Sequence, residues 1–163
     1  MKEWKNIRTA LKASILLLAF TGCVTTSMLK APTTQLFVPE DSFQYEYVYI
    51  TPTSSITSGF NYNGYGSNKS INPSDVIGGI MSKKGYIRVP DLNTAPRAKT
   101  LVANYGESGR RSIGLGYSIE ISIQFISAQS SEPVCSCTAE GIGDTEADDI
   151  RIAITRCLES LFR

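Results

Sequence analysis

Tyr117-Ser-Ile-Glu-Ile-Ser-Ile-Gln-Phe-Ile126 is the clearest strand signal in this chain of 163 residues. Its apolar side chains recur at every second position and alternate with Ser, Glu and Gln. This period of two is typical of a strand with one buried face. A polar turn over 127–133 leads to a second strand predicted over 134–140. The short connection predicts that the two strands pair as an antiparallel hairpin.

Two helices are predicted, each with one apolar stripe. The first begins at the N-cap Asn72, has Pro73 at its first position and ends at Gly85. The second, at the C-terminal end, begins at Asp144 or Thr145. Its first turn carries three acids, which complement the positive end of the helix dipole. We favour that interpretation over a metal site for these acids, which are Glu146, Asp148 and Asp149.

Further strands are predicted over 43–50, 86–89 and 99–105. In the first of these, four aromatic residues fall on one face: Phe43, Tyr45, Tyr47 and Tyr49. They are either a platform for stacking a ligand or the core face of a sheet, and we favour the core face. The Gly-rich segment 106–116 predicts a turn that lacks the spacing of a phosphate loop. Its Arg110 and Arg111 either bind an anion or are solvated turn charges, and the second is favoured.

The order of these elements predicts an α+β fold. Strands follow one another along the chain and the helices fall at two places. We therefore expect a two-layer sandwich, with a mostly antiparallel sheet of about five strands and both helices packed on one face. A single domain over 35–163 accounts for all of these elements.

Residues 53–70 have no usable period and are rich in Ser, Gly, Asn and Tyr. The segment is predicted to be a mobile loop, because loops of this length are uncommon unless they are functional or mobile. Phe60, Tyr62 and Tyr65 make it a candidate partner-binding loop, since Tyr supplies contact area and Gly and Asn supply pliancy. A plain disordered insertion is the favoured alternative.

The N-terminus has the pattern of an export signal. Four basic residues precede an apolar run over 15–20, which is too short to span a bilayer. The run ends in Leu18-Ala-Phe-Thr-Gly-Cys23, which resembles the lipobox of bacterial lipoproteins, and an ordinary signal peptide with a chance cysteine is the alternative. The resemblance implies removal of residues 1–22. It also implies acylation of Cys23 by a diacylglycerol thioether and an amide-linked chain such as palmitate.

Two or more acyl chains give stable membrane anchoring, because each buried methylene contributes about 0.8 kcal/mol. The polar segment 23–34 would then serve as a lipidated tether that holds the domain off the membrane. Residue 24 is Val rather than Asp, which by resemblance to the enteric sorting rule implies the outer membrane. No acidic run follows Cys23, which favours the periplasmic face.

Three cysteines remain once Cys23 is acylated. Cys135 and Cys137 share a strand face, and Cys157 lies on the apolar stripe of the last helix. Three buried core thiols are the favoured interpretation. A disulfide from Cys157 to Cys135 or Cys137 is the second, and metal or redox chemistry is the third.

Composition excludes several functions. The chain has no histidine, which removes imidazole bases, Ser-His-Asp triads and His-ligated zinc. Its formal net charge of +1 gives no electrostatic footprint for nucleic acid. No metal, no cofactor other than the covalent lipid, and no catalytic residue is predicted.

From Tyr117 onward the chain resembles a family of small Gram-negative, Bacteroides-type envelope lipoproteins defined as a domain of unknown function. The likeness lies in the 119–125 strand, the turn into Pro133-Val-Cys135, the Gly141–Gly143 break and the acidic helix start. A Gly85-Tyr86 strand start after a helix also fits. The family provides no catalytic residues to transfer.

We therefore expect a membrane-anchored, non-catalytic binding or assembly module in the periplasm, with membrane lipid and an envelope protein as partners. A structural lipoprotein that associates with itself is an alternative. A histidine-free hydrolase with paired carboxylates is less favoured. Its candidate acids are scattered: Glu46, Glu107, Glu120 and Glu140.

Overall fold

The computed structural model describes residues 28–39, 44–62, 65–114 and 116–163, without the side chains of 58–68. The export signal, residues 23–27 of the tether (Cys23 included) and Phe43 lie outside the described residues. The chain divides into two compact units, 1–30 and 31–163, and the second is described below. In the described part of the chain, no helix has both the length and the apolar character needed to cross a membrane.

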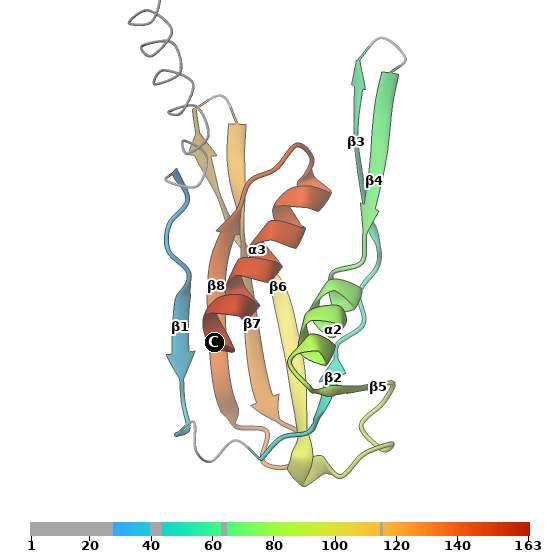
Figure 1. The fold of residues 1–163 in the computed structure, drawn as a ribbon, viewed down its shortest axis with the longest axis vertical. Helices are drawn as coiled ribbons and strands as arrows, with labels where there is room; N and C mark the ends of the chain where they lie inside the picture. The colour runs from blue at the N-terminus through green and yellow to red at the C-terminus, as the bar shows by residue number, and fades with distance from the viewer. Residues whose placement is uncertain (1–27, 40–43, 63–64, 115) are drawn as a thin grey trace, which may run out of the picture. The chain divides into compact units, whose positions relative to one another are not determined.

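A six-stranded sheet forms one layer of the second unit, in the order β1-β8-β7-β6-β2-β5 (Figure 1). Strands β1, β8, β7 and β6 pair antiparallel, whereas β2 is parallel to both β6 and β5. The strand bounds are β1 Thr33–Leu36, β2 Tyr47–Ile50, β5 Ile87–Val89, β6 Thr100–Ile113, β7 Gly116–Ser127 and β8 Pro133–Gly141. The expected α+β fold is confirmed, with six strands rather than about five.

Two helices, α2 Pro73–Lys83 and α3 Glu146–Leu161, lie over the same face of the sheet (Figure 1). Asn72 caps α2 by accepting from Ser74 N at 3.0 Å. Gly85, which follows the C-cap, has a φ of 95°. Thr145, one of the two expected caps, accepts from Asp148 N at the start of α3. A short 3-10 turn, η3 Arg97–Lys99, precedes β6.

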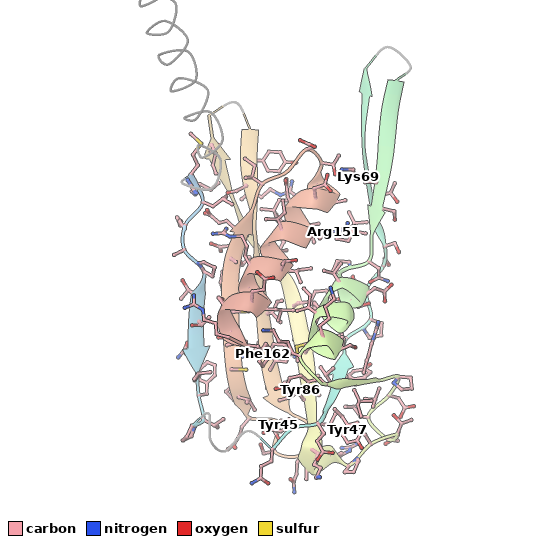
Figure 2. All side chains as sticks on the ribbon, in the orientation of Figure 1. Tyr45, Tyr47, Lys69, Tyr86, Arg151 and Phe162 are labelled. Atoms are coloured by element: carbon pink, nitrogen blue, oxygen red, sulfur yellow. A yellow bond between two sulfur atoms is a disulfide. The ribbon has the colours of Figure 1, made fainter. Side chains whose placement is uncertain are left out.

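The core lies between this sheet face and the two helices. The buried residues of β7, from Ile119 to Phe125, belong to one apolar cluster with Ile77 and Met81 of α2 and with Ile154 and Leu158 of α3. The ring of Phe162 closes the lower end of the core, 5.6 Å from Tyr86 and 5.5 Å from Phe125 between ring centroids. Figure 2 shows Tyr86 and Phe162 next to each other.

The expected aromatic core face of β2 is wrong. Val48 and Ile50 are buried beneath the helices, while Tyr47 and Tyr49 alternate with them and are half-buried. Both faces of β2 carry apolar side chains, with Val48 and Ile50 on one face and Tyr47 and Tyr49 on the other. Alternation alone could not tell which face the helices cover.

The segment 53–70 is not an irregular loop. It forms an antiparallel hairpin of β3 Ile56–Tyr62 and β4 Tyr65–Ile71, in register from Ile56 opposite Ile71 to Tyr62 opposite Tyr65. Its Gly, Ser and Asn residues have low strand propensity, so the sequence signal is weak. The predicted mobility of this segment stays a prediction.

Two other strand limits differ from expectation. The predicted Gly-rich turn at 106–116 is strand as far as Ile113, with a bulge between Glu107 and Gly109, and Gly114 turns the chain at a φ of 59°. β1 overlaps the end of the predicted tether and pairs with β8 at the edge of the sheet. All four of its residues are exposed, so the sequence there has no buried alternation that would predict a strand.

Candidate functional site

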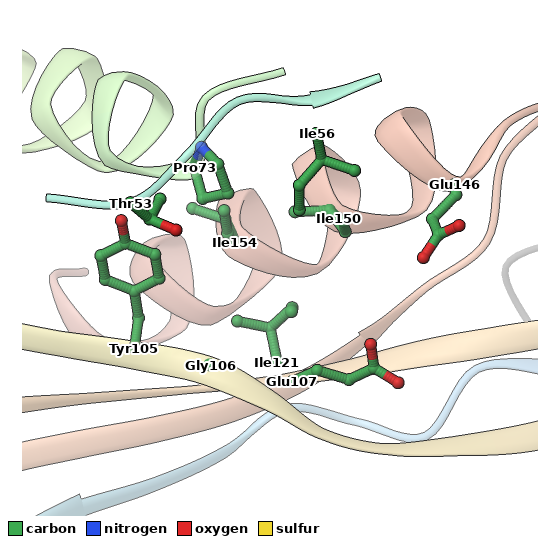
Figure 3. A pocket seen from close by; sticks show the side chains of 10 residues that line it. All are labelled: Thr53, Ile56, Pro73, Tyr105, Gly106, Glu107, Ile121, Glu146, Ile150 and Ile154. Atoms are coloured by element: carbon green, nitrogen blue, oxygen red, sulfur yellow. The ribbon is translucent and has the colours of Figure 1, made fainter. Parts of the chain in front are cut away.

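A cavity of about 170 Å³ lies between the sheet, α3 and the base of the β3–β4 hairpin (Figure 3). Its wall is mainly aliphatic: Ile121 comes from β7, Ile150 and Ile154 from α3, Ile56 from β3 and Pro73 from α2. Ile154 is fully buried and Ile150 nearly so. These side chains therefore form an apolar floor.

One end of the cavity is acidic. Glu107 of β6 and Glu146 of α3 line it, and both bind the guanidinium of Arg110. Arg110 Nη2 lies 3.0 Å from Glu107 Oε2 and 2.7 Å from Glu146 Oε1. Since two carboxylates share one guanidinium, this end of the cavity has a formal charge of −1.

The acidic cluster is fixed in place yet reaches solvent. The Glu107 and Glu146 side chains are 39% and 32% exposed. Arg110 also stacks over the Tyr117 ring, 5.3 Å from its centroid, which is within the range of a cation–π contact. Hydrogen bonding from Arg110 lowers the pKa of Glu107, so this carboxylate is ionised at neutral pH.

Tyr105 and Thr53 line the opposite end of the cavity (Figure 3). The Tyr105 hydroxyl donates to the backbone oxygen of Thr51 at 3.0 Å. Burial raises the pKa of Tyr105, so its hydroxyl stays neutral. The cavity is thus polar but uncharged at this end.

The prediction that Arg110 and Arg111 are turn charges is wrong, although both side chains are solvent-exposed, at 44% and 37%. They lie in β6 and point to opposite sides of the sheet, where each binds carboxylates of this chain. Arg111 Nε lies 2.7 Å from Oε1 of Glu140, whose side chain is only 3% exposed. The bulge after Glu107 brings Arg110 back to the face that carries Glu107 itself.

Phe60 and Tyr62 fall in β3 and Tyr65 in β4. Their side chains lie outside the described residues, so their partner-binding role stays a prediction, as does acylation of Cys23. The register places Tyr62 directly opposite Tyr65 at the end of the hairpin farther from α2.

The structure contains one of the two disulfides considered. Cys137 of β8 is joined to Cys157 of α3, with Cα atoms 5.4 Å apart. Cys135 is the free thiol among the described cysteines, and it is fully buried. Burial raises the pKa of Cys135 to about 12, so it is a poor nucleophile at neutral pH. The favoured expectation of three unpaired core thiols is therefore wrong for Cys137 and Cys157.

The candidate acids are dispersed over the molecule. Glu46 pairs with Lys99 at 2.6 Å, Glu107 with Arg110 and Glu140 with Arg111, while Glu120 accepts from Ser108 at 2.7 Å. The acids of the α3 start are also engaged by separate partners. Asp148 pairs with Lys69 and Asp149 accepts from Gly143 N. Within the described residues, no group of three or more potential ligands could hold a metal ion.

The sequence predicts parts of the cavity but not the cavity itself. The helical spacing of Ile150 and Ile154 predicts a core stripe, and Glu107 and Arg110 are candidates only as separate residues. The site is missed because its walls come from five separate elements and a loop. No local spacing signals that arrangement.

Comparison with known proteins gives structural likeness alone. No family model and no curated protein matches this chain. A PelC dodecamer from Paraburkholderia phytofirmans has a TM-score of 0.49 and 13% identity, over 80% of this chain and 99% of that one. A single-substitution variant of the same dodecamer gives 0.48 and 14%, over 80% and 97%.

Proposed function

We propose that this chain is a lipid-anchored, non-catalytic binding module of the bacterial envelope, and that its ligand or partner enters the cavity beside α3. The observation that carries the proposal is the cavity itself, an aliphatic space of about 170 Å³ with fixed polar groups at its ends. Apolar walls with a few convergent polar groups are the usual form of a binding site.

The envelope location rests on the N-terminal sequence. Acylation of Cys23 would anchor the chain, and residues 24–32 would separate that anchor from β1, which begins at Thr33. The outer membrane and its periplasmic face remain the proposed destination.

Mass spectrometry of the protein extracted from native membranes tests the anchor. We expect a chain that begins at Cys23 and carries the acyl mass, and a Cys23→Ser variant that is neither acylated nor retained in membranes. Thiol labelling of the unfolded, unreduced wild type should modify Cys135 alone, because Cys137 and Cys157 are joined. Two labelled thiols, or a chain that starts at Met1, would contradict the proposal.

Crosslinking in intact envelopes tests the binding role. Thr53 is exposed and lines the cavity, so Thr53→Trp should block it without disturbing the core. Ser54→Trp is the matched control, since Ser54 is exposed and does not line the cavity. We expect crosslinks that Thr53→Trp abolishes and Ser54→Trp leaves intact. Equal crosslinking by the two variants would show that the cavity is not the binding site.

Self-association is a second candidate, supported by the edge strand β1. It pairs with β8 on one side, and among the described strands none pairs with its other side. Leu36 and Phe37 are 49% and 42% exposed there, and no charged residue protects the strand. Such an edge is a template for strand addition from a second chain.

Sedimentation of the full chain in detergent tests this candidate. We expect a mass that rises with protein concentration in the wild type and stays monomeric for Leu36→Lys, which places a charge on the edge. A monomeric mass for the wild type at every concentration would exclude self-association through β1.

A further inference from the structure

The size of the cavity limits the apolar part of its ligand. An engineered protein cavity of about 150 Å³ with similar aliphatic and aromatic walls holds one benzene molecule. The cavity beside α3 has a volume of about 170 Å³, so the apolar group that it buries is of about that size.

The charge at the acidic end limits the polar part of the ligand. Arg110 offsets one of the two carboxylates, which leaves a formal −1 at the rim. A ligand with a negative group would meet this excess charge, whereas an ammonium would neutralise it. Charge complementarity of this kind favours a cation over a neutral or anionic group.

The other polar groups of the cavity do not reverse this preference. Arg110 already donates to both carboxylates and stacks on Tyr117. The remaining polar lining residues, Tyr105 and Thr53, are uncharged. Two further acids lie in the first turn of α3. Asp148 is paired with Lys69, and Asp149 accepts from Gly143 N, so neither brings a positive charge to the cavity.

We propose that the cavity binds a small amphiphilic cation, in which a primary ammonium lies against Glu107 and Glu146 and an apolar group of about benzene size lies against the isoleucines of β7 and α3. This inference rests on the proposed binding function and specifies its ligand. The apolar part supplies most of the burial and the ammonium supplies the selectivity.

Three probes with the same ring and different charge test the inference. Benzylamine is a cation at neutral pH, benzyl alcohol is neutral and benzoate is an anion. Each is titrated into the full-length protein in detergent, with ¹³C-labelled isoleucine methyl groups observed by NMR. Ile121, Ile150 and Ile154 report on the cavity, and Ile77 of α2 is a buried control that does not line it.

We expect benzylamine to shift the cavity methyl signals and not those of Ile77, with an affinity about tenfold above that of benzyl alcohol. Benzoate should bind most weakly. Raising the salt concentration should weaken the binding of benzylamine and leave the binding of benzyl alcohol unchanged. This test needs no variant.

A charge-matched pair of variants tests whether the Glu146 carboxylate causes the preference for a cation. Glu146→Gln should reduce benzylamine affinity about fivefold to tenfold and leave benzyl alcohol unchanged. Glu159→Gln removes the same charge from an exposed position farther along α3 and should change neither affinity. Equal effects of the two variants would overturn the inference.

The outcomes separate the inference from the proposed function. Equal affinity for benzylamine and benzyl alcohol, or tighter binding of benzoate, would overturn the cationic ligand and leave the cavity as a binding site. If no probe shifts the cavity methyl signals, both the inference and the proposed role of the cavity are wrong.

Discussion

Gly141 lies where β8 and α3 approach each other closely. A Cβ atom at this position would lie 1.9 Å from the backbone oxygen of Asp149 and 2.6 Å from the nitrogen of Ala153. Both are backbone atoms of a helix, so neither moves without moving the helix. The glycine is therefore required by close approach rather than by a turn.

Gly141→Ala is expected to lower the free energy of unfolding by about 2–4 kcal/mol, because the added methyl group forces β8 and α3 apart. Gly79→Ala is the matched control. Gly79 is exposed in α2 and a Cβ there would meet nothing within 4 Å, so that variant should gain about 0.5–1 kcal/mol. Urea denaturation measures both, and a neutral Gly141→Ala would contradict the packing described.

Arg111 and Arg110 are adjacent in sequence but bind carboxylates that differ in burial. Arg111 binds the nearly fully buried carboxylate of Glu140, whereas Arg110 binds two carboxylates that solvent reaches. Arg111→Met should cost more stability than Arg110→Met, because it leaves a buried charge less compensated. Arg110→Met should cost about 0.5 kcal/mol. Equal losses in thermal unfolding would show that burial of the carboxylate is unimportant.

Several single residues were predictable from sequence. The caps Asn72 and Thr145 and the stop at Gly85 follow rules that involve only neighbouring positions. The need for glycine at 141 was not predictable, because it depends on Asp149 and Ala153 approaching from another element. The partners of Arg110 and Arg111 likewise depend on which sheet face each one occupies.

At the scale of elements, the β3–β4 hairpin is held to α3 by an ion pair. Lys69 Nζ of β4 lies 2.7 Å from Asp148 Oδ2 at the start of the helix. An isolated two-stranded hairpin is marginally stable in water, so contacts with the body determine its order.

Lys69→Met is expected to speed amide hydrogen exchange in β3 and β4 by about twofold to fivefold, without changing exchange in β7. Lys83→Met, an exposed position in α2, is the control.

The hydrogen bond from Lys69 lowers the pKa of Asp148, so the ion pair is present above the ordinary carboxyl pKa and is lost as pH falls through the lowered one. The protection of β3 and β4, measured as the exchange rate relative to that of an unfolded chain at the same pH, should therefore persist at about pH 4, near the ordinary carboxyl pKa, and fall only below it. Unchanged exchange in Lys69→Met would exclude this role.

The elements that were predicted share a strong internal signal. β7 alternates through its length and both helices have caps and one apolar stripe, so they need no tertiary information. The elements that were missed lack such a signal. β1 is a short exposed edge, and β3, β4 and the second half of β6 are rich in residues with low strand propensity, so their pairing depends on partners elsewhere in the chain.

At the scale of the whole molecule, one covalent link joins the two layers. The Cys137–Cys157 disulfide connects the sheet to α3 across a separation of 20 residues. Closing a loop of this size stabilises a protein by about 3 kcal/mol through its unfolded state.

The double variant Cys137→Ala, Cys157→Ala should therefore have a free energy of unfolding about 3 kcal/mol lower than that of the wild type. Cys135→Ala removes a buried thiol but no crosslink, and should cost about 1–2 kcal/mol. Calorimetry or denaturant titration compares them. Similar losses for the two variants would show that the disulfide adds little beyond packing.

The fold class could be predicted from sequence, because the order of strands and helices is enough to define two layers. The cavity could not be. It forms where α2, α3, the hairpin base and two strands leave a space, and that space is set by how the layers pack rather than by any spacing along the chain.

The position of β1 has a consequence for the route by which the protein assembles. Thr33–Leu36 hydrogen-bond to the segment that includes Cys135 and Thr138, close to the opposite end of the polypeptide. A chain synthesised from its N-terminus must therefore carry this strand unpaired until β8 has been made and has joined β7. The strand nearest the proposed anchor is thus the last to find its partner, and truncation anywhere before β8 leaves it with nothing to join.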